Sequence, residues 1–321
     1  MLKKFQLLMI DKDFSELFKG GGISLVLRFG GLALGYVLTL IIAKLFGARG
    51  LGDYVLAITI LKLFSVLAKF GLDTASIRFI ASFASQEKWK SVLDLRKKVL
   101  SILSITSVVA SLLMYFLADY IADVININVK YIKLNAFFVI PMVFFMLHYE
   151  SLRGLKKIAE FSFFYRISQA LISIISISII YQFSSNSEVP IYAYLTSVFV
   201  VSFLAYLSFK YHLLKRIDDK QSSAEAMMSY SKLLRISIPL MFAESVQFIM
   251  VWIDKLMLGN MTSSHEVGIY FTAFKLSMIA SVSLMAINSI ASPKFAEKFV
   301  NNDIIGLKKV VKQSTKMIFW T

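Results

Sequence analysis

The feature that most constrains this chain is the recurrence of long apolar runs. A membrane-spanning helix needs about 20 apolar residues, and the sequence holds eight runs of about that length. They are residues 23–43, 54–74, 99–118, 133–149, 165–183, 190–209, 237–258 and 267–290. Hydrophobic residues make up 57% of the chain and charged residues only 17%, against roughly 25% charged in a soluble domain. The sequence therefore predicts an all-α, polytopic membrane protein.

Lysine and arginine are unevenly distributed between these runs. Of the 35, 26 lie in the N-terminal segment and in the connections after the second, fourth, sixth and eighth runs. Five, including Lys255, lie in the other connections or at the adjoining ends of runs, and are assigned to the opposite side of the membrane, and four are assigned to its interior. Because cytoplasmic loops carry an excess of Lys and Arg, we expect a multi-pass protein with a cytoplasmic N-terminus. This distribution accounts for most of the net charge of +15 without a nucleic-acid partner.

Signals of catalysis are weak. The chain has no cysteine, which excludes disulfides and thiolate chemistry. Its three histidines are scattered, and no P-loop or nucleophile motif occurs. We therefore expect no enzyme activity and no cofactor or metal.

The stretch 59–78 carries polar residues at helical spacing within an apolar run. They are Lys62, Ser65, Lys69, Asp73 and Ser76. On one continuous helix they would share a face, and a lysine at the bilayer centre costs about 2.5–3.5 kcal/mol. The two lysines therefore predict a watery or ligand-filled interior, with Lys69 and Asp73 as an i,i+4 pair. Lys62 either faces that interior or pairs with an acid on another helix, such as Glu244.

Further charged residues lie in or beside predicted spans. The candidate cations for the interior are Arg28, Lys62, Lys69, Arg166 and Lys275. Arg28 lies near the cytoplasmic end of its span, where it either faces the interior or extends to the headgroups. Glu244 is an acid within the seventh span, and with Asp73 it is our candidate for coupling to a proton or cation.

The polar stretch 216–236 divides the chain. We expect an N-terminal six-helix bundle in residues 1–215, a cytoplasmic linker in 216–236 and the first helices of a second bundle in 237–321. IIAKLFGARGLGDY (41–54) and WIDKLMLGNMTSSHEVGIY (252–270) share a lysine, a short loop and a Gly-x-Tyr sequence, which indicates an internal repeat. A ninth apolar run begins near Met317, from which we expect an incomplete second bundle or, alternatively, a C-terminal interfacial helix.

Several segments resemble bacterial polysaccharide flippases of the O-antigen (Wzx) type. These belong to the multidrug/oligosaccharidyl-lipid/polysaccharide exporter superfamily. The segments are LFGARGLGDY (45–54), KFGLDTASIRFIA (69–81), LRGLKKIAEF (152–161), the long stretch 237–276 and ASPKFAE (291–297). The resemblance implies a MATE-like fold of two bundles in the bacterial cytoplasmic membrane, with the second bundle truncated here.

The resemblance also implies a function. Such a protein would translocate an undecaprenyl-pyrophosphate-linked oligosaccharide, such as an O-antigen unit of lipopolysaccharide, and could work beside the polysaccharide polymerase machinery. A cationic interior fits the pyrophosphate, and rocking of two lobes would give alternating access. Three alternatives stay open: an ion-coupled antiporter of cationic drugs, a membrane polymerase or ligase using the same lipid-linked donor, and a lipid scramblase or scaffold.

Overall fold

The protein is helical throughout the residues that its computed structural model describes, 12–217, 228–300 and 303–320, and no strand occurs among them. The helices are α2 (Lys12–Ala68), α3 (Leu72–Ser85), α4 (Trp89–Phe116), α5 (Ala118–Val124), α6 (Val129–Gly154), α7 (Ile158–Phe163), the π-helix η1 (Phe164–Ser168), α8 (Gln169–Ile180), α9 (Val189–Ile217), α10 (Tyr230–Met261), α11 (Ser264–Val300) and α12 (Ile304–Trp320). The predicted all-α, polytopic fold is confirmed.

Six helical segments in the described residues are long and apolar enough to cross a membrane, and they overlap the first seven predicted spans. Two of these spans lie in α2, whose apolar part, Gly22–Ala68, has 47 residues. At 1.5 Å per residue that is about 70 Å, more than twice the roughly 30 Å hydrocarbon core. The helix is interrupted at Gly47, with φ 71° and ψ −179°. The eighth predicted span falls within α11.

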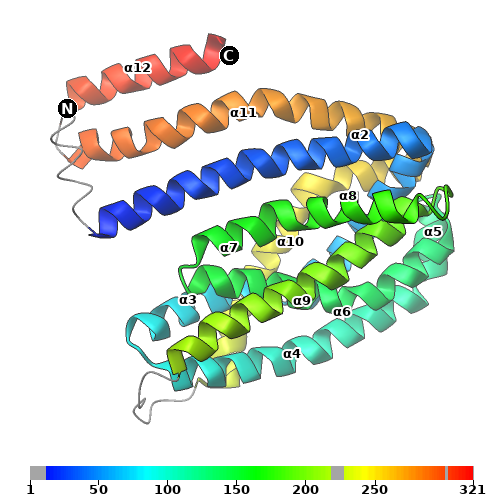
Figure 1. Ribbon diagram of the computed structural model, residues 1–321, viewed down its shortest axis with the longest axis horizontal. Helices are drawn as coiled ribbons and strands as arrows, with labels where there is room; N and C mark the ends of the chain where they lie inside the picture. The colour runs from blue at the N-terminus through cyan, green and yellow to red at the C-terminus, as the bar shows by residue number, and fades with distance from the viewer. Residues whose placement is uncertain (1–11, 218–227, 301–302, 321) are drawn as a thin grey trace. The chain divides into compact units, whose positions relative to one another are not determined.

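The interruption at Gly47 reverses the direction of α2. In Figure 1 this helix begins at the left of the view and reaches the right. Three residues separate the end of α2 from the start of α3, yet α3 lies at the left again. A left-handed backbone of this kind suits glycine, because any Cβ would be strained there. The first two spans thus form an antiparallel pair.

The described residues divide into two compact units, one ending at Gly268 and the other beginning at Ile269. In the first unit α6 is the most deeply buried spanning helix, and it packs against α2, α3, α4 and α9. In Figure 1, α8, α9, α6 and α4 lie next to one another in that spatial order across this unit. Helix α10 packs against α2 and α3. The predicted linker overlaps residues 218–227, which lie outside the described part, so the division into two bundles stays a prediction.

The spanning helices of the first unit form a bundle with two ends, and we name each end after a glycine in one of its turns. The Gly47 end contains the reversal of α2, the α5–α6 connection and the α10–α11 turn. The Gly71 end contains the α2–α3 junction, the α6–α7 connection and the start of α10. The predicted orientation places the Gly71 end in the cytoplasm.

The second unit contains most of α11 and all of α12. Asp303 precedes α12 and accepts a hydrogen bond from the Gly306 backbone N–H at 2.8 Å, and its carboxylate lies 2.6 Å from Lys298 Nζ. An acid at this place caps the first turn of the helix. The apolar run that begins near Met317 forms the last turn of α12.

Candidate functional site

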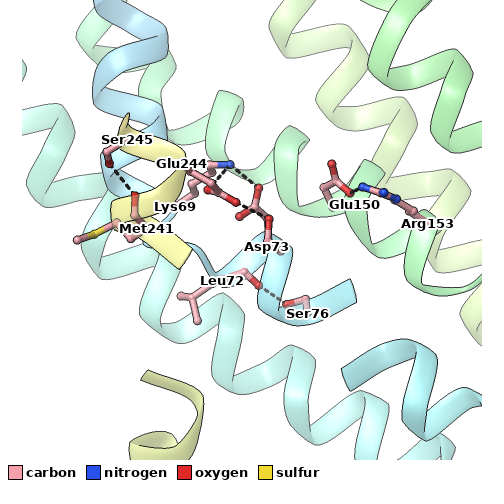
Figure 2. A network of polar contacts seen from close by, with 10 residues as sticks. Lys69, Leu72, Asp73, Ser76, Glu150, Arg153, Met241, Glu244 and Ser245 are labelled. Atoms are coloured by element: carbon pink, nitrogen blue, oxygen red, sulfur yellow. Dashed lines mark hydrogen bonds and ion pairs between the residues drawn. The ribbon is translucent and has the colours of Figure 1, made fainter. Parts of the chain in front are cut away.

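The Gly71 end brings three of the predicted site residues together. Lys69 Nζ lies 2.7 Å from Asp73 Oδ2 and 2.7 Å from Glu244 Oε2, and Figure 2 shows the lysine between the two carboxylates. The three side chains are 11%, 2% and 19% exposed, respectively. The predicted Lys69–Asp73 pair is confirmed, and α10 supplies a second acid to it. We call these three residues the Lys69 cluster.

The backbone of the α2–α3 junction creates this arrangement. Helix α2 ends at Ala68 and α3 begins at Leu72, with positive φ at Phe70 (54°) and Gly71 (67°) between them. A Cβ on Gly71 would lie 2.4 Å from the Ser237 carbonyl oxygen of α10. Only glycine therefore lets α10 come this close.

This break corrects the expectation of a single polar stripe on one continuous helix. Lys62 and Lys69 precede the break, whereas Asp73 follows it on α3. The serines of the expected stripe donate to their own helix, Ser65 Oγ to Leu61 O at 2.7 Å and Ser76 Oγ to Leu72 O at 2.6 Å. Such local bonds are usual for serine in membrane helices. The polar character is concentrated at the junction rather than spread along a helix.

A neighbouring hydroxyl group also forms a hydrogen bond with Glu244. Thr74 Oγ1 donates a hydrogen bond to Glu244 Oε1. On the other side of the junction, Thr106 Oγ1 of α4 donates to Ala68 O at 2.7 Å. This bond satisfies one of the carbonyl groups that the end of α2 leaves open.

A third carboxylate, Glu150 of α6, was not predicted. Its charge interacts with those of Asp73 and Lys69, and its Oε2 lies 3.5 Å from Arg153 NH1. Figure 2 shows this pair beside the Lys69 cluster. Asp73 Oδ1 and Glu150 Oε2 are buried and have no hydrogen-bond partner within the described part of the chain. The one available signal was an acid three residues before an arginine at the end of the fourth span.

The surroundings of Lys69 are thus more acidic than basic. Among the residues whose placement is described, no group of three His, Cys, Asp or Glu side chains is arranged to hold a metal ion. Here the carboxylates surround a lysine. A buried cation in this position is stabilised by charge and hydrogen bonds from both acids.

Lys62 lies elsewhere, beside α10. Its Nζ lies 4.6 Å from the centroid of the Trp252 ring, and Lys255 Nζ lies 5.4 Å from the same ring. These distances are typical of cation–π contacts. Lys255, which the sequence places near the outer end of the seventh predicted span, lies within α10, 1% exposed, with its Nζ 2.7 Å from Asp254 Oδ1. Helix α10 continues to Met261, so Lys255 lies in the helix and not in a turn.

Arg28 and Arg166 form a second group, between α2 and η1. The two guanidinium groups lie close enough for their charges to interact. A Cβ on Gly31 would lie 2.7 Å from Arg166 O, so this glycine lets the two helices approach closely. Arg166 belongs to a π-helical turn, a distortion that is frequent at functional sites. Its Nε is buried and has no hydrogen-bond partner among the described residues.

Lys275 belongs to the second unit. Its Nζ lies 5.4 Å from the ring centroid of Phe271, one turn earlier on α11. The candidate residues therefore occupy four places: the Lys69 cluster, the Arg28–Arg166 pair, the Trp252 ring and α11.

Comparisons with known proteins agree with this architecture. A family model described as polysaccharide biosynthesis protein matches residues 17–299. A MATE multidrug transporter, DinF-BH, solved in complex with a small ligand, superposes with a TM-score of 0.56 at 14% identity, over 94% of this chain and 69% of that one. A solved chain described as "protein A" superposes with a TM-score of 0.58 at 16% identity, over 86% of this chain and 64% of that one.

At such identities the two solved structures show a shared fold. The chain spans about two thirds of their length, 64% of one and 69% of the other. No curated protein sequence matches the chain.

Proposed function

The chain belongs to the polysaccharide biosynthesis protein family, and from that membership we propose that it acts as a flippase for a lipid-linked oligosaccharide. The proposed substrate is an oligosaccharide on undecaprenyl pyrophosphate. The proposed location is the bacterial cytoplasmic membrane, with the N-terminus in the cytoplasm. The mechanism is alternating access by two helical lobes.

The observation that carries this proposal is the Arg28–Arg166 pair. The two guanidinium groups lie close enough for their like charges to repel, and a buried N–H without an acceptor costs about 1–3 kcal/mol. A pyrophosphate between them would remove both penalties, because guanidinium groups bind phosphate oxygens through paired hydrogen bonds. Both residues belong to predicted spans, the first and the fifth, so the proposed anion site would lie within the membrane, where a lipid-linked pyrophosphate must pass.

Lys62, Lys69 and Lys275 are further candidate contacts for the substrate. Lys69 is held by Asp73 and Glu244, so an anion could reach it only after one acid is released. Those two acids are the candidate ion-coupling residues. Binding of a proton or cation to Glu244 would weaken its hold on Lys69 and on the α2–α3 junction.

The test is substitution of Arg166 in cells that display a surface polysaccharide. Arg166→Gln keeps polar character but removes the charge, and we expect at least a tenfold loss of surface polysaccharide with accumulation of lipid-linked units on the cytoplasmic face. Arg166→Lys should retain part of the activity. Arg216→Gln, at an exposed arginine of α9, is the matched control and should behave as wild type.

The other functions predict different results. A drug antiporter with Arg166→Gln would leave polysaccharide display unchanged. A polymerase or ligase would accumulate unpolymerised units on the outer face instead of the inner one. Either result would overturn the proposed function.

A further inference from the structure

The internal repeat recurs as two short segments at the Gly47 end. ARGLGDY (48–54) and SHEVGIY (264–270) each have a small residue, a glycine four positions later and a tyrosine two positions after that. The apolar residue before each glycine, Leu51 or Val267, is 0% exposed. Ala48 thus corresponds to Ser264, and Gly52 corresponds to Gly268.

The two segments contact each other reciprocally. A Cβ on Gly52 would lie 1.6 Å from the Ser264 carbonyl oxygen, and a Cβ on Gly268 would lie 1.9 Å from the Ala48 carbonyl oxygen. Each glycine therefore meets the small residue of the other repeat. This reciprocity is what a two-fold relation between equivalent surfaces produces. Small residues four apart are also the pattern that lets backbones approach closely in membranes.

Neighbouring contacts strengthen this junction. The Asp53 side chain is hydrogen-bonded to the Ser264 side chain. A Cβ on Gly259, near the end of α10, would lie 2.7 Å from Leu56 Cδ2. Asn260 Nδ2 donates to Val124 O at 2.7 Å. The end of α10 is thereby joined to both α2 and α5.

A polar cavity ends at this junction. It has a volume of about 670 Å³ and a lining that includes Arg49, Gly50, Asp53, Asn126 and Tyr131. Leu51, between lining residues in the sequence, is nevertheless fully buried. The cavity therefore lies against one side of segment 48–52, whereas Leu51 within that segment is shielded.

We propose that segments 48–52 and 264–268 form the seal that closes the transport path at the Gly47 end. The contacts at Gly52 and Gly268 are with backbone carbonyl groups, and no ion pair joins the two segments among the described residues. The seal must part for the oligosaccharide to leave, and in this respect the inference rests on the proposed function. In the structure the two segments are in contact.

A cross-link tests whether the seal must open. The chain has no cysteine, so Asp53→Cys with Ser264→Cys gives a single pair at two side chains that are in hydrogen-bond contact. In the full protein we expect oxidation to abolish polysaccharide display and a reductant to restore it. Full display with the disulfide formed, or failure of the pair to cross-link, would overturn the proposal.

A labelling experiment tests the seal without any substrate. Leu51→Cys is to be probed with a membrane-impermeant maleimide from outside, alone and combined with Gly268→Ala. The added methyl group should hold the segments apart and raise the labelling rate several-fold. Gly30→Ala is the matched control, since its Cβ would meet only Ile167 Cδ1 at 3.5 Å. Equal labelling in all three would contradict the seal, whereas faster labelling with Gly268→Ala in a protein whose wild type flips no lipid would contradict the proposed function alone.

Discussion

The contacts beside the two ends of α10 differ in their chemistry. At the Gly71 end the contact includes a buried ion cluster, in which Lys69 bridges Asp73 and Glu244 at 2.7 Å each. At the Gly47 end, Gly52 and Gly268 bring neutral backbone groups together. Separation of the first contact leaves charges in a low-dielectric setting, whereas separation of the second loses mainly van der Waals contacts.

Because of this difference, we expect the two contacts to respond to different changes. The charged contact responds to anything that changes the charge of its members, such as a proton, a cation or an anionic substrate. The neutral contact responds only to shape and force transmitted through the helices. An alternating-access protein with this arrangement would sense its ligands at the Gly71 end and be gated sterically at the Gly47 end.

The largest effect is expected from Lys69→Met. This change leaves Asp73 and Glu244 buried without their cation, and removal of one partner from a buried pair costs roughly 3–5 kcal/mol. The free energy of unfolding in detergent measures it. The triple variant, which combines Lys69→Met with Asp73→Asn and Glu244→Gln, should recover most of the lost free energy of unfolding.

Lys133→Met is the control for this comparison, since Lys133 lies 3.0 Å from Asp119 in an exposed pair. Exposed pairs contribute at most about 1 kcal/mol. Equal losses for Lys69→Met and Lys133→Met would show that the Lys69 cluster is no stronger than a surface pair.

An intermediate effect is expected from Gly71→Ala. The added Cβ would meet Ser237 O at 2.4 Å in a left-handed backbone conformation, and overpacking of this kind costs roughly 1–3 kcal/mol. The melting temperature should fall, and cross-linking between α3 and α10 should decrease. Gly30→Ala, which has space, should leave both unchanged. A stable Gly71→Ala protein with intact cross-linking would show that close approach is not needed at this end.

The smallest effect is expected from Glu188→Gln, at the Gly47 end. Hydrogen bonds from Lys130 and Tyr192 lower the pKa of Glu188 below its usual value. A lowered pKa means that the carboxylate stabilises the fold above its unfolded pKa, and that this contribution is lost as the pH falls through the folded pKa.

Melting temperatures between pH 7 and pH 3 test this prediction. Wild type should lose slightly more stability on acidification than Glu188→Gln does. A larger acid sensitivity in the variant would contradict the assigned direction.

The sequence predicted the helices well and their contacts poorly. Hydropathy located seven spans within the observed helices, because span length is set by the thickness of the membrane. The Lys69–Asp73 pair was predictable because four-residue spacing is a local property. The Lys69–Glu244 contact joins helices far apart in the chain, and no spacing rule reports such a contact.

Two misplacements have local causes. The break at Gly71 was missed because a single glycine inside an apolar run is also compatible with a continuous helix. A turn was considered at Asp254 and Lys255 because two adjacent charges near the end of a span are typical of one, yet α10 continues through them and buries Lys255. The repeated glycine motif was visible in the sequence, but its reciprocal packing required coordinates.

The most direct test of this account is a flipping assay in vesicles with the full-length protein. A fluorescent undecaprenyl-pyrophosphate oligosaccharide is reconstituted, and its accessibility to a membrane-impermeant quencher or glycosidase is followed with wild type, Arg166→Gln and the control Arg216→Gln. We predict that wild type and the control flip the lipid, and that Arg166→Gln slows flipping at least tenfold. Equal rates in wild type and Arg166→Gln, or no flipping by wild type, would contradict the central claim.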